Sequence, residues 1–291
     1  MKKFIKRLFL FFSIIIGFIL FDVCFQKVLL FRNEDMKLPK NVNTLILGHS
    51  HVALGYNTKY IDNTVNIGEQ AEPYVYSYFK LKKIVQNNPK IKRVFVEYTN
   101  NQINKKDMDR WLWEDKYLQH SFKKYGVLLD GDAITSLYKN NTQGFITAFS
   151  KSLFDNIPRL YSLNKNIFLK GQFGGYIPCE EQLKDNQEMR KRTLKDTKIS
   201  FENIFYLRKI VEYCHEHKIE IILVRTPMHK TYDLSYNEIK FEMILKTYFK
   251  NIKFIDNKNF EISDNGFQDR EHLNINGAKI YSQYFNKQIN Q

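Results

Sequence analysis

The sequence predicts an α/β protein: a three-layer α/β/α sandwich with a mostly parallel sheet, an N-terminal transmembrane helix and a long insertion. Two observations predict the sandwich. The first is a set of short apolar runs typical of buried strands, and the second is a set of longer segments whose apolar residues recur at helical spacing. Because the two kinds of segment alternate along the chain, a parallel sheet is favoured. A third observation, an apolar run that follows several basic residues at the start of the chain, predicts the membrane helix.

The first segment, residues 1–26, is the expected membrane anchor. The apolar run over 8–21, extended through Phe25, reaches the lower range of lengths that span a bilayer. No small-x-small cleavage site follows it, so an uncleaved signal anchor is favoured over a cleaved signal peptide. Positive charge at the start places the N-terminus in the cytoplasm. The remaining domain, 27–291, is then expected to be extracytoplasmic, in a single-pass membrane protein.

The expected strands are short apolar runs, and the expected helices carry apolar residues three or four positions apart. In chain order they are a strand over 44–47, a helix over 72–86, a strand over 93–98, a helix over 201–217, a strand over 219–225, a helix from Ser235 or Asn237 to about Phe249, a strand over 253–256 and a helix over 275–289.

The segment over about 102–199 breaks this rhythm and is interpreted as an insertion at the edge of the sheet where the site is expected. It contains both tryptophans. Trp111 is a candidate for stacking on a sugar ring, and the alternative is an ordinary core aromatic. The glycine-rich stretch over 171–178 lacks the lysine and following helix of a phosphate-binding loop. It is expected to be a turn near the site.

Two motifs at opposite ends of the domain suggest a Ser/His/Asp hydrolase. Ser50 follows the first strand and Gly48, which allows a sharp turn at the strand's carboxyl end. Asp269 and His272 lie about twenty residues before the last residue, just before a helix. A serine hydroxyl is a weak nucleophile, so it needs an imidazole to take its proton and a carboxylate to orient that imidazole. The predicted roles are Ser50 nucleophile, His272 base and Asp269 orienting carboxylate.

The strand-Gly-x-Ser pattern at 48–50, followed much later by Asp-x-x-His-Leu-Asn-x-x-Gly-Ala at 269–278, resembles the SGNH (GDSL-like) hydrolase superfamily. Within it, the chain most resembles the membrane-anchored branch of alginate O-acetyltransferase accessory proteins and the D-alanyl-lipoteichoic acid biosynthesis protein. The resemblance implies a flavodoxin-like sandwich and acyl transfer to an exported polysaccharide. It also implies a membrane-bound O-acyltransferase as a partner.

The chain departs from the family pattern at two places. His49 stands where the family usually has aspartate or a small polar residue, and no Gly-x-Asn-Asp motif follows the strand over 93–97. Asn100 or Asn101 would supply the side-chain donor of the oxyanion hole, and the sequence does not choose between them. The backbone N–H groups of Gly68 and Ser50 would supply the others.

Two further histidines are candidates for substrate contacts. His51 either lines the cleft or competes as the base, and His229 follows the carboxyl end of a strand. No His/Asp cluster shows the spacing of a metal site, so neither a metal nor another cofactor is predicted. Cys179 and Cys214 either form one disulfide or remain separate thiols, and separate thiols are favoured.

The net charge of +14 indicates anionic surroundings such as lipid head groups, acidic polysaccharide or a teichoic-type polymer, or else simply a lysine-rich solvated surface. Because no nucleic-acid-binding motif accompanies the charge, nucleic acid is not an expected partner. The predicted function is a membrane-anchored serine acyltransferase acting on cell-envelope glycans. The alternatives are a carbohydrate esterase or deacetylase of the same fold, and a non-catalytic scaffold in a polysaccharide-modifying complex.

Overall fold

The computed structural model describes residues 1–31, 37–161, 174–183, 198–233 and 237–290. Within these ranges the chain forms an α/β fold around an all-parallel sheet, which confirms that part of the predicted fold class. The strands are β1 (Thr44–Leu47), β2 (Thr64–Asn66), β3 (Arg93–Glu97), β4 (Glu220–Arg225) and β5 (Lys253–Asp256), in the spatial order β2-β1-β3-β4-β5.

The helices that follow these strands supply the covering layers. Those around the sheet are α2 (Ser50–Gly55), α3 (Tyr74–Asn87), α4 (Asn100–Ile103), α9 (Phe201–Glu216), α10 (Glu238–Tyr248) and α11 (Ile275–Ile289). The others are α1 (Lys2–Phe31), α5 (Lys105–Trp113), α6 (Asp115–Tyr125), α7 (Gly131–Asn140) and α8 (Thr142–Tyr161), with short 3-10 turns η1 (Thr58–Tyr60), η2 (Gly126–Leu128) and η4 (Asp264–Gly266).

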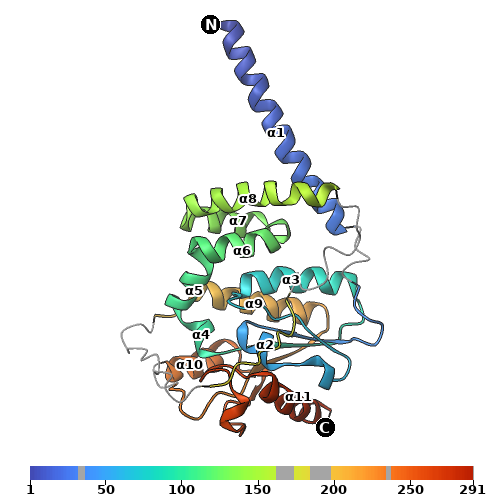
Figure 1. Cartoon of the computed structure of the whole chain (residues 1–291), viewed down its shortest axis with the longest axis vertical. Coiled ribbons are helices and arrows are strands. Elements are labelled where there is room, and N and C mark those ends of the chain that lie inside the picture. Colours follow the sequence, from blue (N-terminus) through green and yellow to red (C-terminus); the bar gives the residue numbers. More distant parts are fainter. Residues whose placement is uncertain (32–36, 162–173, 184–197, 234–236, 291) are drawn as a thin grey trace.

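Both faces of the sheet are buried. In β1, Leu45 and Leu47 point into the core beneath α3 and α9, whereas Ile46 points into the second core beneath α11. Side chains of β3 and β4 alternate in the same way between the two cores. Burial on both faces explains why these strands are continuous apolar runs in the sequence. Helices α3 and α9 cover one face of the sheet, and α2 and α11 lie on the other (Figure 1).

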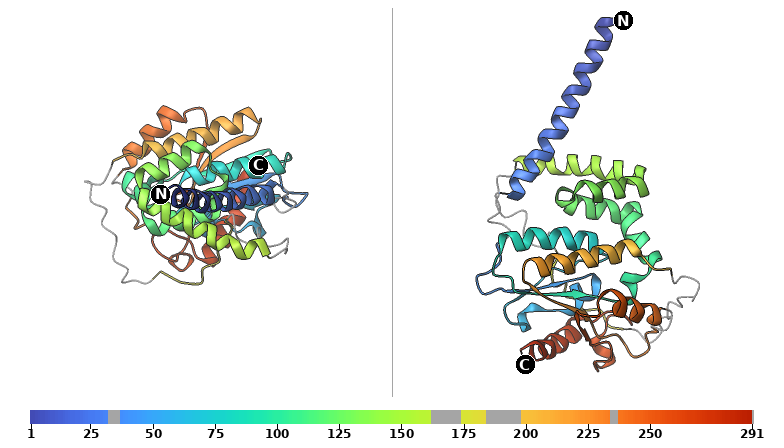
Figure 2. Two further views of the ribbon diagram at one scale, coloured as in Figure 1. Left: turned by 90° about the horizontal axis from the view of Figure 1, so that it is seen from above. Right: turned by 180° about the vertical axis from the view of Figure 1, so that it is seen from behind.

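The helices between β3 and α9 extend the molecule away from the sheet. Helices α6, α7 and α8 form a further layer outside α3, and α1 projects beyond that layer (Figures 1 and 2). Their buried residues, among them Leu118, Phe122 and Leu137, belong to the same core as α3 and α9. The inserted helices are therefore packed onto the α/β body. Parts of the predicted insertion, 162–173 and 184–197, lie outside the described residues.

Helix α1 contains a stretch, Lys2–Phe25, that is long and apolar enough to cross a membrane. Among the described residues no other helix meets these criteria, which an N-terminal signal sequence would also meet. Most of its large apolar side chains are exposed, as Phe9 and Ile14 illustrate. In aqueous solution this surface would be exposed to water, which is unfavourable by roughly 25 cal/mol of free energy for each Å² of apolar area.

The cysteines are separate thiols, as the sequence favoured. Neither Cys179 nor Cys214 takes part in a disulfide. Cys214 is buried on α9, and burial raises the pKa of its thiol to about 12. It is therefore protonated and unreactive at neutral pH.

Gly277 in the first turn of α11 is expected to be intolerant of a side chain. A Cβ there would lie 2.0 Å from the carbonyl oxygen of Gly266, which belongs to η4. Gly277→Ala should therefore push helix and turn apart and lower the free energy of unfolding by about 1–3 kcal/mol, the usual range for overpacking. Urea unfolding of the full chain in mild detergent measures the change.

The matched control is Gly131→Ala at the start of α7, where a Cβ would meet nothing within 4 Å. This variant should be unchanged or up to about 1 kcal/mol more stable, since alanine favours a helix over glycine. Equal stability of the two variants would contradict the close approach of η4 and α11.

Candidate active site

Ser50, His272 and Asp269 lie together at the carboxyl edge of the sheet. Ser50 is the first residue of α2, directly beyond β1, and the other two residues lie in the loop before α11. Oγ of Ser50 is 2.8 Å from Nε2 of His272. Nδ1 of His272 is 2.9 Å from Oδ2 and 3.0 Å from Oδ1 of Asp269. The two predicted motifs, more than two hundred residues apart, thus form one hydrogen-bonded chain of nucleophile, imidazole and carboxylate.

The loop before α11 fixes the carboxylate and the imidazole in place. Oδ1 of Asp269 accepts the backbone N–H groups of Glu271 (2.7 Å) and His272 (2.8 Å). Burial alone would raise the pKa of Asp269, but the hydrogen bonds and charge of His272 outweigh it and hold that pKa below its ordinary value. Asp269 therefore stays ionised at neutral pH, as a carboxylate that orients an imidazole must.

Asn274 is the N-cap of α11, as the sequence predicts. Its Oδ1 accepts the N–H groups of Asn276 and Gly277, and its Nδ2 donates to the carbonyl oxygens of Asn265 and Phe267. This one side chain joins the helix start to the preceding turn. The position of His272, two residues earlier, is set by that junction.

Gly48 brings Ser50 to the site because it has no side chain. A Cβ at this position would lie 2.3 Å from Oε2 of Glu97 and 2.6 Å from Cγ2 of Val52. The backbone of β1 can therefore pass close to the end of β3 only with glycine here. The backbone N–H of the next residue, His49, donates to Oε2 of Glu97 at 2.7 Å.

Ser50 also has a second imidazole beside it. Nδ1 of His49 is 3.1 Å from its Oγ. His272 is the better base, because its carboxylate partner stabilises the imidazolium that forms when the serine loses its proton. His49 is completely buried, and burial lowers its pKa to about 3, although Glu97 acts in the opposite direction. It is therefore neutral and a weak proton acceptor.

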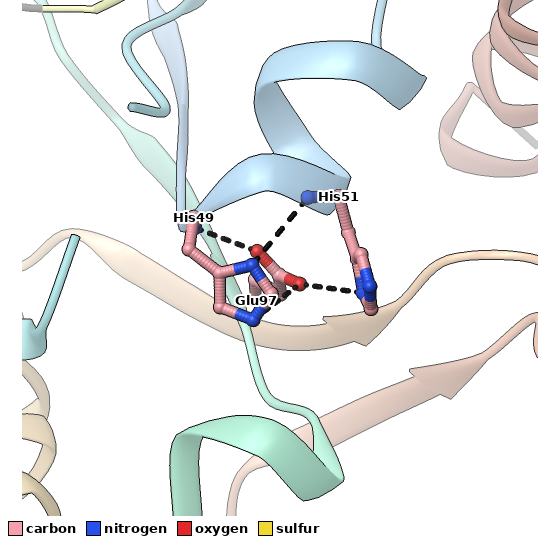
Figure 3. Close-up of side chains that lie close together, drawn as sticks. All are labelled: His49, His51 and Glu97. Atoms are coloured by element: carbon pink, nitrogen blue, oxygen red, sulfur yellow. Dashed lines mark hydrogen bonds and ion pairs between the residues drawn. The ribbon is translucent and has the colours of Figure 1, made fainter. Parts of the chain in front are cut away.

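His49, His51 and Glu97 lie close together (Figure 3) and are buried. Ser50 contacts this cluster through Nδ1 of His49. Oε1 of Glu97 lies 3.0 Å from Nδ1 of His51 and 3.4 Å from Nε2 of His49. Burial alone would raise the pKa of Glu97, but the two imidazoles and the His49 N–H lower it. Burial likewise disfavours charge on His51, yet the carboxylate raises the pKa of His51 above its ordinary value. Glu97 is thus an anion at the centre of the cluster.

The sequence pointed to no cluster of this kind, and no metal site was predicted. The structure places three possible metal ligands, His49, His51 and Glu97, within 4.8 Å of one another. From the sequence, His51 is a candidate for the cleft or for a competing base, His49 is a departure from the family pattern, and Glu97 is the last residue of a strand. The usable signal was a charged residue at the carboxyl end of a buried strand, beside the end of β1.

The three candidate oxyanion donors differ in their surroundings. The N–H of Gly68 donates to Oδ1 of Asn66 at 2.8 Å, within its own loop. Nδ2 of Asn100 donates to Oδ1 of Asn237 and Oε2 of Glu238, both at 2.8 Å. Nδ2 of Asn101 lies 3.0 Å from Oε2 of Glu271, the neighbour of His272. Of the two asparagines, Asn101 is therefore the one beside the triad loop.

The predicted substrate contacts are also only partly compatible with the structure. Trp111 is 7% exposed and its ring packs 5.2 Å from that of His49, so it is a core residue and not an open platform for a sugar. His51 is buried, with its ring 4.9 Å from that of His272, so it packs against that imidazole and does not line the cleft.

His229 lies on the loop after β4, next to the triad loop. Its backbone N–H donates to the carbonyl oxygen of Arg270 at 3.1 Å, and its Nε2 is 3.3 Å from Oδ1 of Asp264. It contributes to a pocket of about 750 Å³ lined also by Lys230, Tyr232 and Phe260. A substrate-binding role for His229 therefore remains compatible with its position.

The glycine-rich stretch predicted as a turn near the site lies there where it is described, from Gly174 onward. The N–H of Gly175 donates to the carbonyl oxygen of Gly68 at 2.8 Å, and that of Ile177 donates to Ala53 in α2 at 2.7 Å. Gly174 has φ +90°, and a Cβ there would lie 2.3 Å from the oxygen of Gly68. Only glycine fits this approach. Residues 171–173 lie outside the described residues.

Comparison with known proteins adds little to this picture. One protein-family model, which carries no functional description, matches residues 178–291. That stretch contains Asp269 and His272 and excludes Ser50, and it covers less than half of the chain. No curated protein matches the sequence.

Proposed function

We propose that the chain is a membrane-anchored serine acyltransferase that modifies cell-envelope glycans through an acyl-serine intermediate. The observation that carries the proposal is the hydrogen-bonded chain from Ser50 through His272 to Asp269. In the first step, Oγ of Ser50 attacks the acyl carbonyl while Nε2 of His272 takes the hydroxyl proton. His272 then returns this proton to the leaving group, which departs with its bonding electron pair.

In the second step an acceptor hydroxyl attacks the acyl-serine, again with His272 taking and returning the proton. The tetrahedral intermediates carry an oxyanion that needs hydrogen-bond donors. The backbone N–H of Ser50 at the start of α2 is one proposed donor, and Nδ2 of Asn101 is the other. For this role Asn101 has to turn from Glu271 toward the substrate or share its two hydrogens between them.

Three features support an envelope glycan as the acceptor. Helix α1 is apolar enough to hold the domain at a membrane, the chain carries a net charge of +14, and the two motifs resemble enzymes that acylate exported polysaccharides. The proposed topology has a cytoplasmic N-terminus and an extracytoplasmic domain. A membrane-bound O-acyltransferase that passes acyl groups across the bilayer is the proposed partner.

The second candidate function is a carbohydrate esterase, which uses the same first step and lets water attack the acyl-serine. The half-exposed side chains of the triad favour neither acceptor, since His272 is 19% and Asp269 35% exposed. A scaffold without activity is less favoured, because a scaffold has no need for the three side chains to keep hydrogen-bonding distance.

Fluorophosphonate labelling of the full chain in mild detergent tests the proposal. An activated serine should gain one phosphonyl group per chain by intact mass, and both Ser50→Ala and His272→Ala should lose the label. His215→Ala, which changes an exposed histidine on α9, is the control and should label like the unaltered protein. Absence of labelling in the folded, unaltered chain would favour the scaffold. If labelling occurs, acyl donors tested with glycan acceptors and with water then separate transferase from esterase.

A further inference from the structure

The cluster of His49, His51 and Glu97 is not used by the proposed acyl transfer, yet it is the most unusual group of buried side chains near the site. All three are fully or almost fully buried, at 0%, 2% and 0% exposure. They come from two elements that meet at the carboxyl edge of the sheet: the junction of β1 with α2, and the last residue of β3. Apolar packing therefore does not account for their placement.

The cluster contains polar atoms without suitable partners among the described residues. Both ring nitrogens of His51 and Oε1 of Glu97 are buried without a well-aligned hydrogen bond. The 3.0 Å contact between Nδ1 of His51 and this oxygen is close but not aligned as a hydrogen bond. An unsatisfied buried polar atom costs about 1–3 kcal/mol. Such atoms in a native fold call for an explanation, and an ion is one of the common ones.

The spacing of the cluster fits a metal. Ligands about 2.0–2.1 Å from a tetrahedral Zn²⁺ are about 3.3 Å from one another. Oε1 of Glu97 lies 3.0 Å and 3.4 Å from the facing nitrogens of His51 and His49, and the three possible ligand atoms all lie within 4.8 Å. The third distance, between the two histidine nitrogens, is at most 4.8 Å. A small movement of the imidazoles would therefore bring all three ligand atoms to tetrahedral spacing.

We propose that His49, His51 and Glu97 bind one divalent transition-metal ion, with Zn²⁺ as the best match. Each histidine contributes one ring nitrogen and Glu97 contributes Oε1. Two imidazoles and a carboxylate form a ligand set that zinc accepts in proteins, with a further position left for another ligand. The donor atoms and their spacing exclude the oxygen-rich, six- to eight-coordinate sites that Ca²⁺ prefers.

The site has a consequence for Ser50 that rests on the proposed function. Nε2 of His49 lies 3.4 Å from Oε1 of Glu97 and 3.1 Å from Oγ1 of Thr99. Its Nδ1 lies 3.1 Å from Oγ of Ser50 and accepts the backbone N–H of His51 at 3.5 Å. A metal ion on Nε2 would replace its contact with Thr99 and leave the hydrogen on Nδ1. His49 would then give up the long contact from the His51 N–H and donate to Oγ, so the serine hydrogen would be directed to His272. Without the ion, a hydrogen on Nε2 leaves Nδ1 as an acceptor that competes with His272 for that same hydrogen.

Metal titration of the full chain in mild detergent tests the proposal. The protein is stripped with a chelator and titrated with Co²⁺, followed by its absorption spectrum, and with Zn²⁺ in competition. We expect one ion per chain for the unaltered protein and for the His215→Ala control. His51→Ala and Glu97→Gln should bind more than about 100-fold more weakly, because loss of a supporting residue alone costs 10- to 100-fold. Ser50→Ala should bind normally.

Thermal unfolding shows whether a variant that fails to bind the metal is still folded. Added Zn²⁺ should raise the Tm of the unaltered chain and leave that of Glu97→Gln unchanged, since a ligand stabilises only the state that binds it. No saturable binding by the unaltered chain, or equal binding by Glu97→Gln, would overturn the metal site. The cluster would then be a closed ion pair between His51 and Glu97.

Fluorophosphonate labelling of metal-free and metal-loaded protein separates this proposal from the proposed function. Metal binding without any labelling would leave the metal site standing and remove the serine chemistry. Labelling of a chain that binds no metal would support the serine chemistry and remove the metal site. If both proposals hold, Ser50 should label faster in the metal-loaded protein.

Discussion

His272→Ala is expected to lower kcat/KM for an activated acyl ester by about four orders of magnitude or more, and Ser50→Ala should fall to the same residual rate. The two changes remove parts of one unit, so the double variant should be no slower than either single one. Each expected loss follows from the 2.8 Å contact between Oγ and Nε2, through which the serine becomes a nucleophile in the proposed mechanism. Initial rates with a chromogenic acetyl ester measure the effect.

Asp269→Asn should cost about as much, although it preserves the shape of the side chain. The carboxylate accepts a hydrogen from Nδ1 of His272, which leaves Nε2 free to take the proton of Ser50. An amide at this place lets Nδ1 accept instead, so the hydrogen of His272 moves to Nε2 and the base is lost. The variant should remain folded, because Oδ1 of asparagine still accepts the backbone N–H groups of Glu271 and His272.

The exposed His215 again offers a control, since His215→Ala should retain the full rate. Retention of more than a tenth of kcat/KM in His272→Ala would contradict the assignment of the base. His49, 3.1 Å from the same oxygen, would then be the alternative, and His49→Gln would be the variant that loses activity.

The sequence predicted best what depends on local pattern. The strands β1, β3 and β4 are apolar because both faces of the sheet are covered, and Asn274 is recognisable as a cap from its position alone. Strand β5 lies at the edge of the sheet, with Phe254 and Ile255 between two exposed charged residues. Strand β2 was missed. It is three residues long and lies at the edge of the sheet, so its sequence, Thr-Val-Asn, carries no apolar run.

Side-chain partners were harder to predict because they depend on packing between distant segments. Trp111 lies on α5, in the segment between β3 and α9 whose fold the sequence did not reveal, and it packs against His49 beyond the end of β1. The N–H of Gly68 is engaged by Asn66, two residues earlier. Such an Asx turn is common, but nothing in the sequence excludes the alternative of a free N–H. The buried role of Glu97 appears only once β1 and β3 are neighbours.

Arg225 at the end of β4 is a buried cation that pairs with two partly exposed carboxylates. It is 1% exposed and donates to both carboxylate oxygens of Asp256 and of Glu238. It also donates to Oδ1 of Asn100 at 3.1 Å and lies 4.2 Å from the ring of Phe241. These contacts tie β5, α10 and α4 to one side chain, next to the loop that carries His229.

Arg225→Met is therefore expected to lower the free energy of unfolding by about 3 kcal/mol, as breaking a buried ion pair leaves carboxylates without their partner. This is the low end of the usual range, because Glu238 and Asp256 are 20% and 31% exposed and water reaches them. Methionine keeps the contact with Phe241, so the loss reports on charge. Urea unfolding of the full chain in mild detergent measures it.

Arg93→Met on β3 is the matched control. Arg93 pairs with Glu220 at 2.6 Å across neighbouring strands of the same sheet, but the two side chains are 33% and 49% exposed. A surface pair of this kind is worth about 0–1 kcal/mol. Similar losses in the two variants would contradict a special role for Arg225.

The pH dependence of stability should separate the ionic network from simple packing. Burial alone would raise the pKa of Glu238, but Arg225, Lys258 and Asn100 lower it to about 2, against an ordinary value of 4.5. Its contribution to stability is therefore complete above pH 4.5 and is lost as the pH falls toward 2. Without Arg225 the pKa of Glu238 should rise toward 4.5, so Arg225→Met should lose less stability across this interval than the unaltered chain does. Parallel loss of stability in the two proteins would mean that Arg225 acts through packing and not through its charge.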